Sequence, residues 1–382
     1  MGLILNDLKN ACELEHVCDY VNNRTTSSMN YISTENMLPN KGGISESTII
    51  PPGTTTEYKI GDILISNIRP YFQKIWCADR CGGCSADVLC IRAKENTDSK
   101  YLYYLLSQQA FFDYVMSGAK GCKMPRGDKK QIMQWPVNIP AIDVQKKVVA
   151  ILSSLDNKIR LNRRINDNLE EQAKALFKSW FVDFEPFKGG KFVDSKLGPI
   201  PEGWSIGKVN DVVQILSGFA FKSETFVQSG PYRLITIKGV QDGYLDISGA
   251  SYISKVPLKM PAYCNLEIGD ILLSLTGNVG RVCIVDRPNL LLNQRVAKLQ
   301  PRRDKQDLLF VYILFRQDTF KNHLLQIARG TAQLNLSPVE TREISIILPP
   351  ANVLLEFSKI GQYLFDKIAL SNQETLRLSA LR

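Results

Sequence analysis

The residues of this sequence best suited to chemistry are three cysteines, Cys77, Cys81 and Cys84, spaced as C-x3-C-x2-C. Three thiolates at this spacing could hold an iron–sulfur cluster, with Cys90 as a fourth ligand, or a zinc ion. A turn between two strands, with thiols that bind nothing, explains the same residues. A metal- or Fe–S-dependent enzyme therefore stays open as one function, and we assign no metal ligand from the sequence alone.

Other catalytic signatures are missing from the sequence. It contains no G-x-x-x-x-G-K-[ST] loop for phosphate and only two histidines, His16 and His323, for acid–base chemistry. The two Pro-Pro pairs that could begin the loop of a DNA amino-methylating enzyme are followed by Gly53 and Ala351, not by an aromatic residue. We therefore predict a binding protein without a catalytic residue of its own.

The composition indicates a soluble globular protein with more than one domain. Apolar residues make up 44% of the 382 residues and charged residues 22%, and no apolar run reaches the roughly 18 residues that cross a bilayer. Nine cysteines without a recognisable secretory signal favour free thiols in the cytoplasm. The formal charge of +9 is spread along the chain and suggests a polyanionic partner.

An internal repeat organises the chain. The pentapeptide Ile-Gly-Asp-Ile-Leu occurs at 60–64 and again at 268–272, an offset of 208 residues. Farther along, Gly121 corresponds to Gly330 at an offset of 209. A unit of about 200 residues is too long for a solenoid repeat, so we interpret it as a duplicated module.

Each copy has two parts. Residues 1–142 and 199–350 mix short β-rich runs, Gly/Pro turns and helical stretches, which is typical of an α+β domain. Residues 143–198 and 351–382 follow Ile-Pro and Leu-Pro-Pro and have helical periodicity. The predicted fold is α+β, with two similar α/β domains separated by long helices.

The helical parts carry a seam of residues at steps of three and four, which is typical of a coiled coil. No Gly or Pro interrupts 143–185, so one helix of about 40 residues, near 60 Å long, is predicted. An amphipathic helix packed on its own domain would show the same pattern, but two seams in one register favour a coiled-coil pair. The predicted seam residues are Val148, Ile151, Leu155, Asn162, Ile165 and Leu169 in the first helix and Phe357, Ile360, Leu364 and Leu378 in the second.

Residues that can recognise DNA bases recur at corresponding places of the two copies. Arg reads guanine and Asn or Gln reads adenine through paired hydrogen bonds, while Lys and Arg hold phosphates. Each segment by itself is compatible with a plain loop, but the recurrence favours nucleic-acid binding. The candidates are Arg69, Tyr71 and Lys74 in the first copy and Asn278, Arg281, Gln294, Arg295, Thr331, Gln333 and Asn335 in the second.

One segment of the first copy is densely basic. It holds Lys120, Lys123, Arg126, Lys129 and Lys130, with Asp128 opposing them. A solvated loop is the plain explanation for such a run. We predict instead that Lys123, Arg126, Lys129 and Lys130 contact DNA phosphates, which adds affinity without base discrimination.

Several segments resemble the specificity subunit, HsdS, of type I restriction-modification systems. Those similar to family segments are the Gly-Asp-Ile-Leu strands at 61–64 and 269–272, the helical run at 155–170, and the stretches 176–184 and 197–204. The helical run, which contains the tripeptide Asn-Arg-Arg at 162–164, is the segment most specific to the family. The resemblance covers nearly the whole chain.

The resemblance implies two target-recognition domains, 1–142 and 199–350, and two antiparallel conserved helices, in 143–198 and 351–382, forming an internal pseudo-twofold repeat. The duplicated module with its antiparallel helices predicts a bipartite target in double-stranded DNA, and the different reading segments of the two copies predict that the target is asymmetric. The resemblance also implies assembly with two methyltransferase (HsdM) subunits and with restriction/translocase (HsdR) subunits. S-adenosylmethionine, ATP and Mg²⁺ are then expected on the partner subunits only, with no cofactor on this chain and no membrane contact. A coiled-coil adaptor with two protein-binding domains is the remaining alternative.

Overall fold

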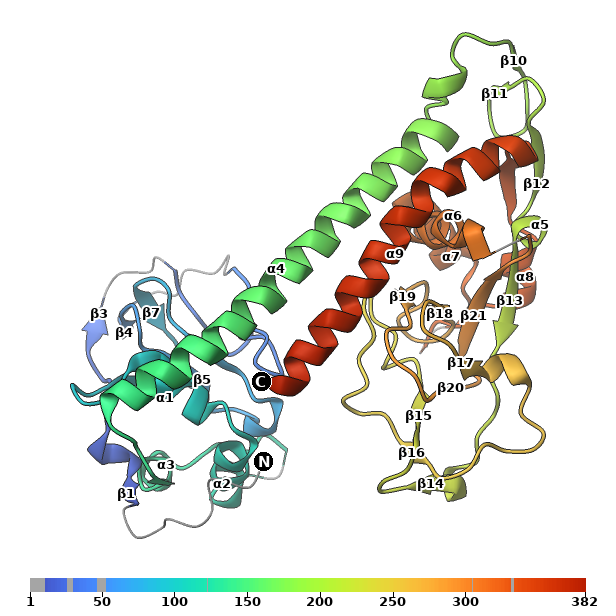
Figure 1. Ribbon diagram of the computed structural model, residues 1–382. Coiled ribbons are helices and arrows are strands. Elements are labelled where there is room, and N and C mark those ends of the chain that lie inside the picture. The colour runs from blue at the N-terminus through green and yellow to red at the C-terminus, as the bar shows by residue number, and fades with distance from the viewer. Residues whose placement is uncertain (1–10, 26–29, 47–52, 122, 304, 331–332) are drawn as a thin grey trace. The chain divides into compact units, whose positions relative to one another are not determined.

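The computed structural model describes residues 11–25, 30–46, 53–121, 123–303, 305–330 and 333–382. The chain divides into two compact units, Met1–Ser154 and Leu155–Arg382. Each unit is built on an antiparallel four-stranded sheet, with helices packed on one face and a second, smaller or more irregular sheet on the other (Figure 1). No helix in the described ranges combines the length and the apolar character needed to span a bilayer.

The central sheet of the first unit has the order β2-β8-β5-β6 and separates two cores. Ile63 and Ile65 pack with the helices, whereas Leu64 between them faces the sheet β3-β4-β7. Successive side chains of a strand point to opposite faces of its sheet, so all three can be buried when both faces are covered. The elements are β1 (Cys12–Glu13), η2 (Leu14–His16), β2 (Cys18–Tyr20), β3 (Arg24–Thr25), β4 (Thr55–Tyr58), β5 (Ile63–Ser66), η3 (Pro70–Phe72), β6 (Ile75–Cys77), β7 (Gly82–Cys84), β8 (Val88–Ala93), α1 (Ser99–Leu106), α2 (Gln109–Ser117), α3 (Lys129–Met133) and β9 (Pro136–Val137), followed by the start of α4 (Ile142–Phe181).

The second unit repeats this plan with the sheet β13-β21-β18-β19. Ile271 and Leu273 pack with α6, and Leu272 faces the sheet β14-β16-β15-β20-β17. After α4 and η4 (Glu185–Phe187), the elements are β10 (Phe192–Val193), β11 (Ile200–Pro201), β12 (Ser205–Lys208), α5 (Val209–Val212), β13 (Val213–Ser217), η5 (Ser223–Thr225), β14 (Phe226–Val227), β15 (Tyr232–Ile235), β16 (Tyr252–Ile253), η6 (Ala262–Cys264), β17 (Asn265–Leu266), β18 (Ile271–Ser274), β19 (Val282–Ile284), β20 (Leu290–Leu292), β21 (Val296–Pro301), η7 (Lys305–Asp307), α6 (Leu308–Arg316), α7 (Asp318–Ile327), α8 (Pro338–Arg342), β22 (Ser345–Leu348) and α9 (Ala351–Leu381).

The predicted α+β repeat is confirmed at the level of single strand pairs. Ile63 pairs with Ile91 across β5 and β8, and Ile271 pairs with Leu299 across β18 and β21. Both members of the pair shift by 208 residues. The two helices that follow the sheet, the short helix after them and the long helix that ends each copy also recur in the same order.

Within the second unit, α9 runs antiparallel to the C-terminal part of α4 (Figure 1). Asn162 Nδ2 donates to Glu374 Oε2 at 2.8 Å, and Asn166 Nδ2 donates to Asn372 Oδ1 at 2.6 Å. Farther along α4, the ring of Phe177 lies 6.2 Å from that of Phe357. Residue numbers therefore rise on one helix as they fall on the other, and the long antiparallel helices predicted from the sequence are present.

Three of the predicted seam residues are exposed and not buried in the structure. Ile151 is 63% exposed, Ile165 41% and Ile360 50%. Asn162 and Phe357 are buried, and Val148, Leu155, Leu169, Leu364 and Leu378 are half-buried. The inward face of α4 instead carries Asn166, which is bonded to α9, and the buried Ala173. The buried face of α9 carries Gly361 and Ile368.

The N-terminal half of α9 packs on its own domain, as expected for an amphipathic helix that is not part of a coiled coil. Phe357 is fully buried in the core that contains α6. A Cβ at Gly361 would lie 2.5 Å from Leu309 Cδ2, so the glycine allows the two helices to approach closely. Beyond that core the α4–α9 contact includes polar pairs, among them the ion pair of Arg382 with Asp156 at 3.0 Å.

Candidate nucleic-acid interface

In the first copy, two segments far apart in sequence are joined into one frame at the end of β5. Arg69 N donates to Pro125 O at 2.8 Å, and Gly127 N donates to Asn67 O at 3.3 Å. Lys120 and Arg126 exchange both of their backbone hydrogen bonds at 2.9 Å. The loop that follows β5 is thereby fixed to the basic segment before α3, so the predicted base-reading and phosphate-binding residues lie together.

The second copy builds the same frame at the end of β18. Gly277 N donates to Leu334 O at 2.9 Å, and Leu336 N donates to Leu275 O at 2.7 Å. Arg329 and Asn335 exchange backbone hydrogen bonds as Lys120 and Arg126 do. Every one of these bonds is related to its counterpart by the offset of 208 or 209 residues. We call the two frames, together with the turns that directly follow β5 and β18, the loop platforms; among the described residues they comprise 67–74 with 120–121 and 123–127, and 275–281 with 329–330 and 333–336.

The first loop platform presents aromatic and cationic side chains. Arg69 has a left-handed backbone (φ 50°) just before the turn η3, and Tyr71 in that turn is 48% exposed beside Phe72. Arg126 forms an ion pair with Asp87 at 3.2 Å. Lys74 is less available than predicted, because its ammonium donates to Thr34 O at 2.7 Å and burial lowers its pKa.

The second loop platform presents mostly amide and guanidinium groups. Gln333 is exposed, as are Gln294 and Arg295 in the neighbouring segment just before β21, and Thr331 lies outside the described residues. The side-chain oxygen of Asn335 accepts a hydrogen bond from Thr276 Oγ1 at 2.7 Å. The Asn278 oxygen, in the amide orientation that satisfies both groups, accepts from Arg281 Nη1 and Nη2 at 3.2 and 3.3 Å.

The basic segment of the first copy leads into α3. Asp128 caps this helix by accepting hydrogen bonds from the backbone N–H groups of Gln131 and Lys130, which lower its pKa. Lys129 donates to the Tyr20 hydroxyl at 2.6 Å, a partner 109 residues away that the sequence does not reveal. Lys123 and Lys130 are exposed, and neither has an ion-pair partner among the described residues.

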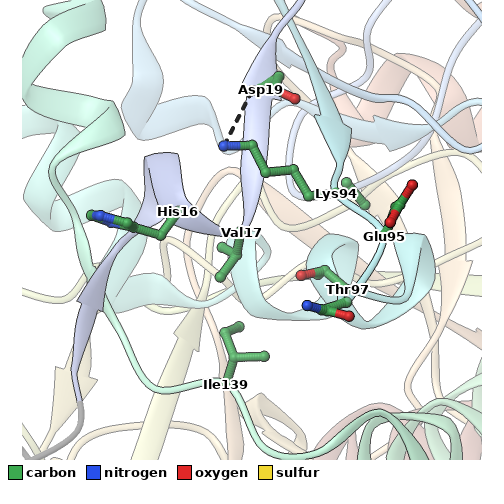
Figure 2. Close-up of a pocket in the computed structure, with 9 residues that line it drawn as sticks. His16, Val17, Asp19, Lys94, Glu95, Thr97 and Ile139 are labelled. Carbon is green, nitrogen blue, oxygen red and sulfur yellow. Dashed lines mark ion pairs between the residues drawn. The ribbon is translucent and has the colours of Figure 1, made fainter.

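A separate hollow lies at the other end of the first sheet. It is lined by His16, Asp19 and Lys94 together with Val17, Glu95, Thr97 and Ile139, and the Lys94 ammonium lies 3.4 Å from Asp19 (Figure 2). This hollow follows the end of β8, which is antiparallel to β5. It is therefore remote from the first loop platform, and the binding residues predicted from the sequence do not line it.

Comparison with known proteins decides the family. The model of the type I restriction modification DNA specificity domain matches residues 9–171 and 201–379, which is most of the chain in two regions. The chain belongs to this family. A type I restriction enzyme specificity subunit of Haemophilus influenzae, HindI, is 25% identical over 92% of this chain and 91% of its own length. That of Methanocaldococcus jannaschii, MjaIX, is 27% identical over 76% of this chain and 67% of its own.

A solved S subunit of a type I restriction-modification system from M. genitalium shares the fold. Its TM-score is 0.50 at 14% identity, over 97% of this chain and 93% of the other. The two regions that the family model matches each contain one loop platform and one long helix. Specificity subunits of this family are recognition proteins and not catalysts.

In this specificity-domain protein the cysteine cluster does not assemble. Cys77 lies in β6 of the four-stranded sheet, whereas Cys84 lies in β7 of the three-stranded sheet, and Cys81 is exposed between them. Among the described residues, the only His, Cys, Asp or Glu set close enough to share an ion is Glu13, Glu15 and His16, all exposed. The spacing that suggested a metal site is thus a turn between two sheets.

Thiol reactivity gives a first prediction for the specificity-domain protein. Burial raises the pKa of Cys77 to about 11 and that of Cys84 to about 12, so both stay protonated at neutral pH. Iodoacetamide should therefore alkylate Cys81 well before Cys77 or Cys84 in the native protein, as peptide mass spectrometry would measure. A Cys81→Ser variant serves as the control. Stoichiometric zinc or iron, with Cys81 protected until a chelator is added, would contradict the prediction.

The exposed lysines of the basic segment give a second prediction. Lys130→Ala should weaken binding to every DNA sequence alike and reduce the slope of log K against log salt by about 0.9, the value for one phosphate contact. Binding isotherms at several salt concentrations measure both effects. Lys59→Ala is a control of equal charge, because Lys59 precedes β5 at the end away from the first loop platform. A changed sequence preference would instead make Lys130 a base-reading residue.

Proposed function

We propose that this chain is the DNA sequence-specificity subunit of a type I restriction-modification complex and that it reads a bipartite, asymmetric target in double-stranded DNA. The observation that carries the proposal is the duplicated loop platform. Two domains of the same construction each present a frame of the same backbone hydrogen bonds. Each domain then meets the duplex through an equivalent surface and specifies one half-site.

The asymmetry of the target follows from the side chains on the two loop platforms. The first offers Arg69 and Tyr71, and the second offers Asn278 and Arg281. Arg pairs with guanine, Asn pairs with adenine, and an aromatic ring makes apolar contacts. Since the two sets present different donors and acceptors, the two half-sites differ in sequence.

The long helices supply the surface for the other subunits of the complex. Ile165, Ile360, Tyr363 and Leu370 are large apolar side chains left exposed on α4 and α9. Exposed apolar residues along two helices suit packing against helices of a partner. In this proposal they contact methyltransferase subunits, which carry S-adenosylmethionine, and restriction/translocase subunits, which use ATP and Mg²⁺, in the cytoplasm.

Methylation mapping tests the proposed function. The chain would be expressed with and without a type I methyltransferase subunit from the same source in a methylation-free host, and methylated positions would be read by long-read sequencing. We expect one split motif with two different halves, which requires both proteins. The isolated chain should bind DNA weakly, because neither domain carries a large net charge. A palindromic or continuous motif, or methylation that is independent of this chain, would refute the proposal.

A further inference from the structure

A chain of buried contacts begins on α4 and leads toward the second loop platform. Glu170 on α4 accepts a hydrogen bond from Arg316 Nη2 at 2.6 Å through one carboxylate oxygen and from the Tyr312 hydroxyl at 2.6 Å through the other. The side chains of Arg316 and Glu170 are only 10% and 13% exposed. A buried guanidinium must keep its carboxylate partner, because an uncompensated buried charge is strongly unfavourable.

Arg316 connects Glu170 to the segment 241–243, because the same guanidinium bonds both. Its Nη1 donates to Asp242 Oδ1 at 2.8 Å and to Val282 O at 3.2 Å, and Lys321 donates to the other oxygen of Asp242 at 2.6 Å. Gly243 has a positive φ of 89°, and a Cβ there would lie 3.3 Å from the Arg316 guanidinium. The segment is therefore held against the guanidinium by charge on one side and by close backbone packing on the other.

The last link joins this segment to a residue of the predicted DNA interface. Gln241, next to Asp242, accepts a hydrogen bond from Arg281 Nη1 and donates to Lys238 O at 2.7 Å. The donation to a backbone carbonyl fixes which way the Gln241 amide faces. Arg281 is thus oriented by Gln241 on one side and by Asn278 on the other.

The residues that make these contacts with the second domain are not repeated at the corresponding positions of the chain. The positions that correspond to Glu170, Arg316 and Arg281 are Ser379, Ser107 and Gln73. Gln73 instead shares a hydrogen bond with Gln109. The contacts described above are all made by residues of the second unit. When they are broken, base discrimination in the half-site of the second domain can be compared with that in the half-site of the first domain of the same molecule.

We propose that Glu170 is a positioning residue for base recognition by the second domain: through Arg316 and the segment 241–243 it sets the orientation of Arg281. The inference rests on the proposed function. Without the Glu170 charge, Arg316 turns toward other acceptors and the segment loses its anchor. Arg281 then samples several rotamers, and its pairing with one base edge is lost, while phosphate contacts elsewhere persist.

Binding measurements on substituted duplexes test this inference. The complex with the methyltransferase would be assayed on the recognised sequence and on duplexes that each carry one changed base pair. The variants are Glu170→Gln, which removes the negative charge beside Arg316, and Gln241→Ala, which removes the hydrogen bond to Arg281 and leaves the buried Glu170–Arg316 ion pair in place. Glu171→Gln is the matched control, because this neighbour on α4 is exposed and its carboxylate forms an ion pair with Lys174, one turn along the same helix.

We expect Glu170→Gln and Gln241→Ala to lower discrimination about tenfold at the same position of one half-site, the loss expected when a good side-chain–base pair is removed. The double variant should lose no more than either single one, and Glu171→Gln should match the wild type. Unchanged discrimination in Gln241→Ala, or equal weakening on all duplexes, would overturn the inference alone. If Glu170→Gln fails to fold, Gln241→Ala still decides the question. A wild-type complex without any discrimination would overturn the proposed function as well.

Discussion

Phe357→Ala should destabilise the second unit by about 3–5 kcal/mol, the cost of removing a buried phenylalanine from a packed core. The Phe357 ring is fully buried, and its centroid lies 4.8 Å from Phe181, 5.8 Å from Trp180 and 6.2 Å from Phe310. The residue therefore joins α4, α6 and α9, and no single neighbour can fill the space it leaves. Urea unfolding followed by tryptophan fluorescence should show a lower midpoint at an unchanged slope.

The control for this measurement is Ile360→Ala, one turn along the same helix. Ile360 is half exposed, and its removal should change the free energy of unfolding by well under the cost at Phe357. The comparison separates the buried face of α9 from its outer face. Equal losses for the two variants would show that α9 packs through a different face from the one described.

The parts of the fold that the sequence predicts are those carried by local pattern. The repeated Ile-Gly-Asp-Ile-Leu marks the central strand of each sheet, and the long stretch without Gly or Pro marks α4. Both signals depend on neighbours within a few residues, so they survive without knowledge of tertiary contacts.

In the predicted seam, hydrophobicity alone does not identify which residues of the helices are buried. The periodicity predicts that the apolar Ile165 is buried, but it is 41% exposed, whereas Asn166 beside it faces α9 and donates to Asn372. A polar residue can take an inward position when its partner comes from another helix, and that partner is 206 residues away. Periodicity of apolar residues alone cannot distinguish the two rows in such a case.

For the same reason, the sequence predicts only part of the candidate interface. The platform loops follow from the alignment of the two copies, but the partners that orient their side chains do not. Gln241 lies 40 residues from Arg281, and Tyr20 lies 109 residues from Lys129. The cysteines show the converse, because Cys77 and Cys84 are close in sequence but lie in two different sheets, so their spacing alone does not indicate a shared site.

Exchange of the first recognition domain should replace one half-site and leave the other intact. The place of the junction matters, because Gln145 near the start of α4 is fully buried and belongs to the first unit. Its side chain accepts from Asp98 N at 2.9 Å and donates to Asn96 O at 3.0 Å. A junction at 142 separates Gln145 from these partners, whereas a junction after Ser154 keeps them together.

We therefore expect a chimera that carries residues 1–154 of another family member, joined without a change in helix length, to assemble and to methylate a new split motif. Its first half would come from the donor and its second half from this chain, since the second loop platform and the contacts of Glu170 lie wholly in the retained part. The reciprocal exchange of 155–382, which keeps Glu170 and Phe357 with their partners, should change the other half, and long-read sequencing of methylated DNA measures both. A chimera that alters both halves would contradict independent reading, because it would require one domain to change the base contacts of the other.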